Sequence, residues 1–542
     1  MPQLNVETVA RRRTHAALPE RVDVAVIGSG LGGLVTAAHL ARAGLSVAVF
    51  EGHYTAGGCA TQFARGPKRA QYHFDVGLHY VGDCADDGQI PRLLRELDVD
   101  VRFRPLDPDG FDTLIFPGVE FRIPASVDRY RERLVERFSD QRRAIDKYVA
   151  LLRAVMLGAR AADRGVRPSL RELPALALAG LRFAPHRHAT IGSVLDHFGV
   201  SDPALRAVLL GQSGDYGLPP SRVSAALHLG LAGHYFRGAY YPEGGGQVIA
   251  DRLAARIESL GGSIHLRHPI ERILIENGRA IGVRVAARGG EPARDVRADI
   301  VVSNADLKKT FLELVGPEHL PSELVQKTRN YEMAAALLIT FLGVRGGIPT
   351  MRNANYWVFD TLDTERVYRE LATTHGCYIT SASLKDPDNA LHHAPAGISN
   401  VEVMTLVPAS LEHFGVDPRD VATWDYKKNE RYRAIKARLE DDMIRRLDAV
   451  FPGAAERVVF RETATPVSHV RYTAATDGTG YGLAATPEQF FDRRPGYRAP
   501  IGGLYLCGAS TRAGHGIVGA MTSGKHAALR IRKDQPLGAQ HR

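Results

Sequence analysis

The sequence predicts a mixed α/β fold in which one domain is assembled from separated parts of the chain. Two observations carry this prediction. Near the N-terminus, residues 22–51 read as a strand, a glycine-rich loop, a helix and a second strand. Near the C-terminus, residues 503–528 read as a short apolar strand, a glycine-containing loop and a helix rich in small residues. Because both patterns are typical of nucleotide-binding α/β units, we expect the two ends of the chain to meet in one domain.

The first of these units has the features of a dinucleotide-binding motif. Val22–Ile27 is an apolar strand. Three glycines follow it at the spacing GxGxxG, namely Gly28, Gly30 and Gly33. A loop without side chains lets the backbone approach a pyrophosphate, and the predicted helix Leu34–Arg42 points its first amides at that anion. The second strand, Ser46–Phe50, is followed by Glu51, a carboxylate placed to bind an unphosphorylated ribose.

Two further segments extend this site beyond the first nucleotide. Gly57 and Gly58 indicate that the backbone passes close to another part of a long ligand, with an ordinary loop as the alternative. At the other end of the chain, the strand Gly503–Cys507 leads into a helix that begins near Gly516. The positive end of that helix would suit the negative charge that a reduced flavin gathers around N1 and O2. No second GxGxxG motif supplies a separate nicotinamide domain.

With these motifs the chain resembles the FAD-dependent amine-oxidase-like superfamily, and within it the branch of retinol saturases, carotenoid isomerases and phytoene desaturases. The resemblance extends from about Val22 to Ala528. Beyond the glycine motif it is carried by the strings AGGCATQF (Ala56–Phe63), HFDVGLHYVG (His73–Gly82), HYFRGAYYPEGG (His234–Gly245), VVSNA (Val301–Ala305), SLKDP (Ser383–Pro387) and LYLCGAS (Leu504–Ser510). Many amine oxidases have an arginine after the glycine pair, whereas this chain has Cys59, which weighs against amine oxidation.

The resemblance implies FAD as the cofactor and indicates which residues bind it. The ADP half would lie against Gly28, Gly30, Gly33, Glu51, Gly57 and Gly58. The ribityl and flavin half would lie against Gly508, Ala509, Gly516, Ile517, Val518 and Gly519. Ile270 falls where the superfamily presents its backbone to adenine. No motif tethers the flavin covalently, so we expect it to bind noncovalently.

The positions of these motifs predict a discontinuous domain order. We assign residues 21–124, 234–306 and 466–533 to the FAD-binding domain and residues 125–233 and 307–465 to an inserted substrate domain, after a flexible N-terminus at 1–20. Helical spacing over Ser126–Gly165 and Thr190–Phe198 predicts a helical cap. Runs at Ala335–Phe341 and Asn400–Leu406 predict strands of a mixed sheet, and Asn277-Gly278 predicts a hairpin.

Composition excludes several other classes of protein. With 542 residues the chain is longer than one compact core, and 44% hydrophobic residues allow it to be globular throughout. The cysteines, Cys59, Cys84, Cys377 and Cys507, are far apart and match no disulfide framework or metal-ligand spacing, so we expect no metal. The net charge of +9 is scattered along the chain, which disfavours nucleic-acid binding. The sequence lacks a secretory signal and any run of ~20 apolar residues, so we expect a cytoplasmic protein.

One apolar run in the predicted cap has two interpretations. Leu173–Leu181 is too short to cross a bilayer but, with Arg182 and Arg187 beside it, suits a position in a membrane interface. A buried helix is the alternative interpretation. Because polyene substrates are insoluble in water, we expect peripheral contact with the inner face of a membrane.

The chemistry expected of a flavin narrows the search for catalytic residues. A flavin exchanges hydride at N5, so the protein must place a carbon–carbon bond there and manage the partner proton. The ionisable aromatics of two glycine-containing strings are the candidates: His79, Tyr80, His234, Tyr235, Tyr240 and Tyr241. Among them we choose His79, Tyr80 and Tyr235 for the catalytic acid, while a structural role stays open for each histidine. Asp75 is expected to be a structural hydrogen-bond acceptor.

We therefore expect an FAD-dependent oxidoreductase that acts on the CH–CH bonds of an apolar isoprenoid or polyene. A retinol-saturase-like reduction is the first expectation, with carotenoid desaturation or cis–trans isomerisation as alternatives. The electron partner is unassigned and could be a nicotinamide, a quinone or oxygen. The competing hypothesis from another class is a non-catalytic prenyl- or lipid-binding protein that resembles the Rab GDP-dissociation inhibitors. Motifs for both halves of FAD favour the enzyme.

Overall fold

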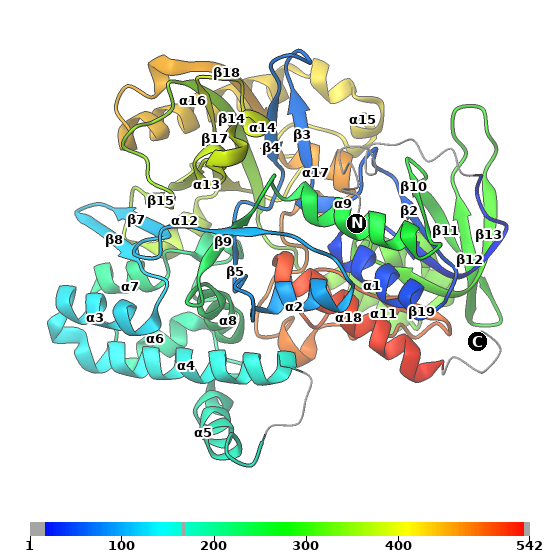
Figure 1. Cartoon of the computed structure of the whole chain (residues 1–542), viewed down its shortest axis with the longest axis horizontal. Coiled ribbons are helices and arrows are strands. Elements are labelled where there is room, and N and C mark those ends of the chain that lie inside the picture. The colour runs from blue at the N-terminus through cyan, green and yellow to red at the C-terminus, as the bar shows by residue number, and fades with distance from the viewer. Residues whose placement is uncertain (1–16, 165–168, 536–542) are drawn as a thin grey trace.

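The computed structural model of the protein describes residues 17–164 and 169–535, which form a mixed α/β molecule with two large sheets (Figure 1). Each large sheet has seven strands. Two small sheets are formed by β3 (Gln62–Arg65) with β4 (Tyr72–Asp75), and by β5 (Val81–Gly82), β9 (Ala239–Pro242) and β6 (Phe103–Pro105). The predicted fold class is confirmed. Most of the predicted flexible N-terminus and Gly165 lie outside the described residues.

The first large sheet unites distant parts of the chain. Its parallel strands are, in spatial order, β10 (Ser263–Leu266), β2 (Val47–Glu51), β1 (Arg21–Ile27), β13 (Arg294–Ser303) and β19 (Leu504–Leu506). The central strands β1 and β2 are almost continuously apolar and buried, as parallel strands covered on both faces are. The two ends of the chain therefore meet in one sheet, as predicted.

An antiparallel hairpin extends this sheet. β11 (Ile270–Glu276) pairs with β12 (Arg279–Val285), and β12 also pairs with β13 in antiparallel orientation. Between them, Asn277 and Gly278 have φ values of 50° and 73°. Positive φ at both central residues is the requirement of a type I′ turn, which Asn-Gly satisfies best. The predicted hairpin is confirmed.

Closely packed helices cover the first sheet. α1 (Leu31–Arg42) begins directly after the glycine loop, at Leu31 instead of the predicted Leu34, and contacts both α9 (Gln247–Ser259) and α18 (Gly516–Asp534). A Cβ at Gly524 would lie 2.4 Å from the carbonyl oxygen of Gly32. Gly524 of α18 is therefore needed for the backbones of α1 and α18 to approach each other.

The second large sheet is mostly antiparallel. Its strands are, in spatial order, β18 (Val458–Ala464), β14 (Ala336–Arg345), β17 (Ile398–Val407), β16 (Gly376–Thr380), β15 (Asn355–Phe359), β7 (Asp112–Phe116) and β8 (Val119–Ile123). The two strands predicted for the inserted domain are confirmed as parts of β14 and β17. The hairpin β7–β8 lies within residues 21–124 yet pairs with β15, so this part of the predicted FAD-binding segment contributes to the other sheet. The domain boundaries stay a prediction.

Helices form a cap beside the second sheet, in the lower left part of Figure 1. They are α3 (Val127–Arg137), α4 (Arg142–Arg164), α5 (Leu173–Phe183), α6 (Ile191–Phe198), α7 (Pro203–Leu209) and α8 (Ala225–Tyr235). The predicted helical stretch is broken near Phe138, and Thr190 caps α6 by accepting from the amide of Ser193. Within the described residues, no helix has the length and apolarity to cross a membrane.

The remaining helices connect these layers. They are α2 (Gln89–Glu96), α10 (Leu307–Lys309), α11 (Ser322–Asn330), α12 (Thr364–Arg369), α13 (Ala382–Lys385), α14 (Ala390–His393), α15 (Pro418–Thr423), α16 (Glu430–Val450) and α17 (Pro466–Thr473). The cap and the second sheet share one apolar core, to which Leu114, Leu209 and Phe341 belong. A separate core packs α1 and α9 against the first sheet.

Candidate active site

One cavity of about 1840 Å³ connects the first sheet to the cap. Its lining includes Gly28 and Glu51 at the first sheet, Met404 of the second sheet, and Tyr235 of the cap. A single space therefore joins the predicted nucleotide site to the predicted catalytic residues.

The glycine loop and Glu51 form the nucleotide end of this cavity. Glu51 Oε2 accepts hydrogen bonds from the Ser29 amide (2.8 Å) and hydroxyl (2.6 Å). Its Oε1 accepts from the amide of His53 at 2.8 Å. Because a carboxylate offers about four acceptor positions, these three bonds fix Glu51 and leave capacity for a ribose hydroxyl. Gly33 lies behind the loop, where a Cβ would be 2.2 Å from the carbonyl oxygen of Gly28, so Gly33 allows close packing and does not line the cavity.

Asn304 is a central residue of this end that sequence reasoning missed. It follows β13, and its amide donates to the carbonyl of Ile27 at 2.8 Å. A Cβ added at Gly30 or at Gly508 would lie 2.7 Å from its side chain. Asn304 therefore fills the space between the two glycine loops from opposite ends of the chain. Asn304 belongs to the string VVSNA, which carries the family resemblance, and this membership was the signal that could have identified it.

The other residues predicted to bind FAD, from both the ADP half and the flavin half, also lie on the cavity wall. The lining includes Gly57, Gly58, Ile270, Gly508, Ala509 and Gly516 to Gly519. In the described part of the chain, no side chain caps the N-terminus of α18 at His515, so the first amides of α18 can bind an acceptor atom of a ligand. Cys59, which stands where many amine oxidases have arginine, also lines the cavity.

A buried arginine adds positive charge near this wall. Arg494 is 2% exposed, and its Nη1 donates to the carbonyl oxygen of Ala509 at 3.1 Å. Among the residues that the structure describes, its Nε has no hydrogen-bond partner. Burial lowers the pKa of Arg494 to about 10, which still leaves it a cation at neutral pH. The glycine cradle, the fixed Glu51, the helix terminus and this cation together fit FAD, whose pyrophosphate and reduced flavin are both anionic.

The three predicted catalytic residues meet at the cap end of the cavity. His79, Tyr80 and Tyr235 all line it. Tyr80 and Tyr235 stack with ring centroids 4.4 Å apart and planes inclined by 4°. His79 Nδ1 lies 2.7 Å from Glu402 Oε2. Lys385, from the string SLKDP, is buried and donates to the carbonyl of His79, which fixes the backbone there.

The other candidates are placed as structural residues. His234 lines the cavity, but its Nδ1 hydrogen-bonds to the carbonyl of Leu231 and burial lowers its pKa to about 4. Tyr241 is fully buried and donates to Asp75, which also accepts from the amide of Gly246 at 3.0 Å. Asp75 is thus the structural acceptor that the sequence predicts. Tyr240 lies on β9, with a half-buried side chain.

Two carboxylates beside Tyr80 were not predicted. The Tyr80 hydroxyl is 3.1 Å from both Asp112 Oδ2 and Asp215 Oδ2, and the Tyr235 hydroxyl is 3.4 Å from Asp215. Burial raises the pKa of Asp112 to about 6. Burial, reinforced by the charge of Asp112, raises the pKa of Asp215 to about 8. Their only sequence signal was an acidic residue within an apolar strand and another within a glycine-rich turn.

Aromatic and aliphatic side chains form the walls around this acidic pair. They are Leu227, Leu231, Ile339, Phe341, Trp357, Phe359, Tyr368, Tyr378, Met404, Leu406, Tyr481 and Phe490. A mostly apolar chamber with a few polar groups is typical of a site for an extended apolar ligand.

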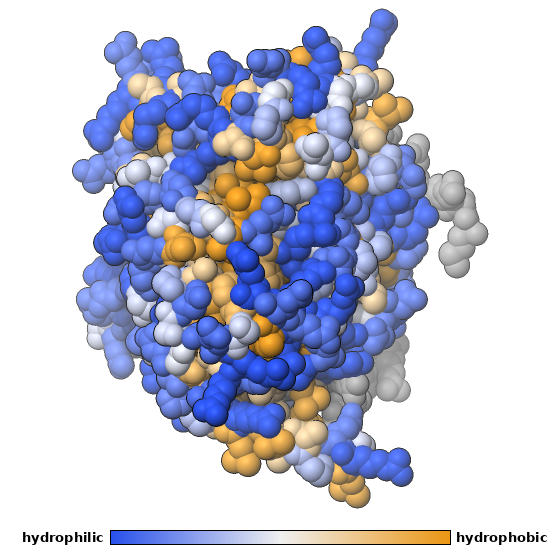
Figure 2. Space-filling view, turned by 90° about the vertical axis from the view of Figure 1, so that its left-hand side faces the viewer, coloured by the Kyte–Doolittle hydropathy of each residue, from blue (hydrophilic) through white to orange (hydrophobic). Residues whose placement is uncertain are grey.

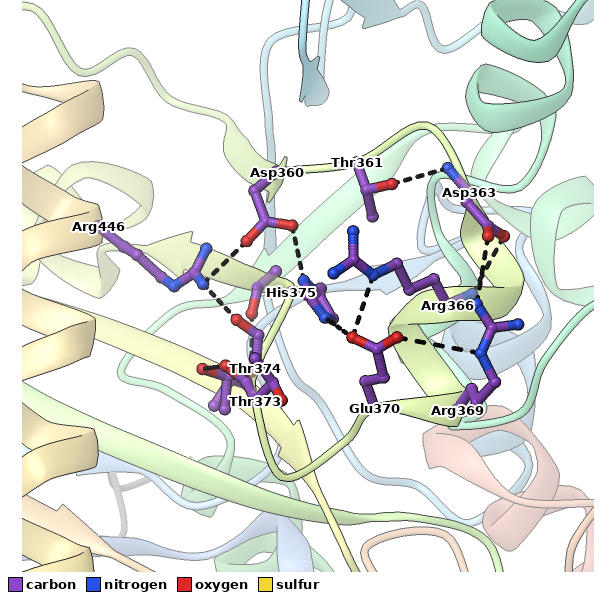
Figure 3. A network of polar contacts seen from close by, with 12 residues as sticks. Asp360, Thr361, Asp363, Arg366, Arg369, Glu370, Thr373, Thr374, His375 and Arg446 are labelled. Atoms are coloured by element: carbon purple, nitrogen blue, oxygen red, sulfur yellow. Dashed lines mark hydrogen bonds and ion pairs between the residues drawn. The ribbon is translucent and has the colours of Figure 1, made fainter.

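A polar network stiffens one wall of this chamber (Figure 3). His375, which lines the cavity, has Nδ1 3.0 Å from Asp360 and Nε2 2.7 Å from Glu370. Arg446 of α16 contacts Asp360 at 3.3 Å, and Arg366 of α12 contacts Glu370 at 3.0 Å. The network ties the loop before β16 to two helices.

Comparisons with known proteins show the family and the fold of this chain. The family described as flavin containing amine oxidoreductase matches residues 31–388 and 429–532. The all-trans-retinol 13,14-reductase of Rattus norvegicus is 30% identical over 91% of this chain and 82% of its own length. The chloroplastic prolycopene isomerase 1 of an Oncidium hybrid cultivar is 25% identical over 95% and 84%. The crystal structure of an oxidoreductase from Methanosarcina mazei has a TM-score of 0.58 at 18% identity and covers 94% of this chain and 99% of its own, which shows a shared fold.

Proposed function

Because the chain belongs to the family of flavin-containing amine oxidoreductases, we propose that it is an FAD-dependent oxidoreductase that reduces a double bond of an apolar polyene. The observation that carries this proposal is the continuity of one cavity from the glycine cradle to the aromatic chamber. The first part fits FAD, and the second fits a long apolar substrate.

The chain's own residues bind and orient the two ligands. When bound, FAD supplies hydride exchange at N5. Gly28, Gly30 and Glu51 would hold the ADP half of FAD, and the amides that begin at Gly516 would hold its flavin half. The aromatic walls would exclude water and hold the substrate next to the flavin site.

The names of the relatives favour a conjugated substrate. Retinol and prolycopene are both polyenes, and the relatives that carry these names match more than nine-tenths of this chain. Cys59 replaces the arginine found in many amine oxidases, and the chamber is apolar, which supports a hydrocarbon over an amine. The nucleotide cradle argues against a lipid carrier that works without flavin.

The test is conversion of polyenes by the FAD-loaded protein. The protein is reduced with dithionite without oxygen, incubated with all-trans-retinol or prolycopene, and the products are analysed by mass spectrometry. We expect a gain of two hydrogen atoms per molecule. An unchanged mass with altered retention would instead indicate isomerisation, and a failure to convert any polyene would refute the proposed substrate class.

We propose further that α5 binds the surface of a membrane and makes the protein peripheral. Leu173, Leu178 and Leu181 are 45%, 49% and 73% exposed, and only Ala179 of this helix is buried. Several large exposed apolar residues on one helix mark an interaction site. The exposure argues against the buried-helix interpretation.

The position of α5 supports a lipid partner. Figure 1 shows α5 projecting from the body of the molecule, and hydrophobic residues gather at the same lower end in Figure 2. α5 packs against α4, whose residue Ala159 lines the cavity. An apolar substrate that leaves the lipid at α5 would therefore reach the chamber by a short path, with Arg171 and Arg182 beside acidic headgroups.

A further inference from the structure

The hydrogen bonds around Asp112 define where the protons of the acidic pair lie. Three N–H donors bind its carboxylate: Asn355 Nδ2 at 2.9 Å, Gln212 Nε2 at 2.8 Å and Trp357 Nε1 at 3.1 Å. Donors of this kind stabilise the charged form of a carboxylate. Asp112 is therefore the member of the pair that is held as an anion.

Tyr80 then requires a proton on Asp215. Its hydroxyl lies 3.1 Å from both carboxylates, but it carries one hydrogen and can donate to one of them only. If it donates to the charged Asp112, its contact with Asp215 becomes a hydrogen bond only when Asp215 donates to Tyr80. Two like charges this close and this buried also disfavour ionisation of both.

We propose that Asp215 is a protonated carboxylic acid and that it delivers the partner proton to the substrate during reduction of the double bond. This role rests on the proposed function. Asp215 lines the cavity, whereas Asp112 is fully buried beneath it. Tyr80 positions the acid. Tyr80 is disfavoured as the proton donor itself, because loss of its proton would leave a phenolate beside the charged Asp112.

The reaction balances with one external reductant. A two-electron donor such as dithionite first reduces the bound FAD. Reduction of the substrate then consumes one hydride from the flavin and one proton from Asp215. The π bond breaks, two C–H bonds form, the flavin is oxidised by two electrons, and Asp215 becomes a carboxylate that regains its proton from solvent.

The electrostatic surroundings support this assignment. A pKa of about 8 keeps Asp215 protonated at neutral pH. This pKa is also close enough to neutral pH for Asp215 to transfer its proton. The titratable groups that face it are Asp112, Tyr80, Tyr216, Tyr235, Tyr368, Tyr378, Tyr481 and His515. Burial raises the pKa of each of these tyrosines, so none ionises before Asp215.

The first test measures the proton directly and needs no substrate. Infrared difference spectra of the FAD-loaded protein are recorded as the pH is raised through about 8. We expect the C=O band of a carboxylic acid to be lost in the wild type and to be missing from Asp215→Asn. A wild-type protein in which no buried carboxylic acid titrates between neutral pH and the alkaline range would overturn the proposal.

The second test separates Asp215 from the other candidate acids. Asp215→Asn should keep its FAD and accept electrons from dithionite at the wild-type rate, but reduce retinol about 10²–10⁴-fold more slowly. Tyr80→Phe should lose less than about 10²-fold, since it keeps the acid. Asp140→Asn, at an exposed carboxylate, is the matched control.

The outcomes test the role of Asp215 separately from the proposed reaction. Equal turnover of the wild type and Asp215→Asn would overturn the role of Asp215 as the acid and leave the proposed function standing. Loss of turnover in Tyr80→Phe with full turnover in Asp215→Asn would assign the proton to Tyr80. A wild type that reduces no polyene would refute the proposed function and the acid's role, while the infrared titration would still report whether Asp215 carries a proton.

Discussion

At the scale of single residues, the glycines of the cavity could be predicted from the sequence, whereas its two buried carboxylates could not. The glycine spacing is a local pattern, so Gly28 and Gly30 could be located from the sequence. Asp112 and Asp215 could not, because the property that matters is their distance from Tyr80, which depends on residues far apart in the chain. His79, Tyr80 and Tyr235 all line the cavity, and their catalytic roles stay predictions.

The first residue-scale prediction concerns Gly30. Gly30→Val should strongly reduce FAD content, because a Cβ there would lie 2.7 Å from Asn304 and the added methyl groups would occupy the space of the pyrophosphate. Flavin absorbance per purified protein measures the effect. Gly158→Val is the control, since a Cβ at that helical glycine meets no atom of the described residues within 4 Å. A folded Gly30→Val protein with full FAD would contradict the assigned loop.

The second residue-scale prediction is the effect of Asp215 on stability. Its pKa is raised from 3.8 to about 8 by folding, so between these values the folded state binds a proton that the unfolded state has lost. The free energy of unfolding should therefore fall as the pH rises through this window and level off above it. Denaturant unfolding of the wild type should show a steeper fall than unfolding of Asp215→Asn. Parallel pH curves for the two proteins would mean that Asp215 has an ordinary pKa.

At the scale of elements, local sequence signals located helices, strands and turns, whereas the pairing of strands that are distant in the chain could not be predicted. The unit β1–α1–β2 and the hairpin at Asn277-Gly278 were located because turn chemistry and periodicity are encoded in adjacent residues. The pairing of β7 with β15 joins residues more than two hundred positions apart, so no local pattern indicated it. For α5, periodicity could not separate a buried helix from an exposed one.

The element-scale prediction concerns α5. The double change Leu178→Glu and Leu181→Glu should reduce sedimentation with liposomes that contain acidic lipids, since buried apolar area drives interfacial binding. FAD content should not change, because Leu178 and Leu181 are exposed and are not among the residues that line the cavity in the described part of the chain. Leu391→Glu, at a leucine that is 75% exposed on α14, is the matched control. Equal sedimentation of the double variant and the wild type would exclude α5 as the membrane contact.

At the scale of the whole molecule, function depends on how distant segments close around one cavity. Strands from both ends of the chain and from its middle form the nucleotide end, while the cap and the second sheet form the chamber. Cofactor motifs at both termini made the discontinuous arrangement predictable. The shape of the chamber was not predictable, because its walls come from segments that share no sequence pattern.

The central claim is that one cavity brings reduced FAD and a polyene together. The most direct test is a single turnover: the FAD-loaded protein is reduced without oxygen, mixed with all-trans-retinol, and followed by absorbance. The flavin band near ~450 nm should return as the polyene absorbance of retinol is lost, at matching rates. A saturated alcohol of the same chain length should leave the flavin reduced. If the flavin stays reduced with retinol, prolycopene and other polyenes alike, the claim is contradicted.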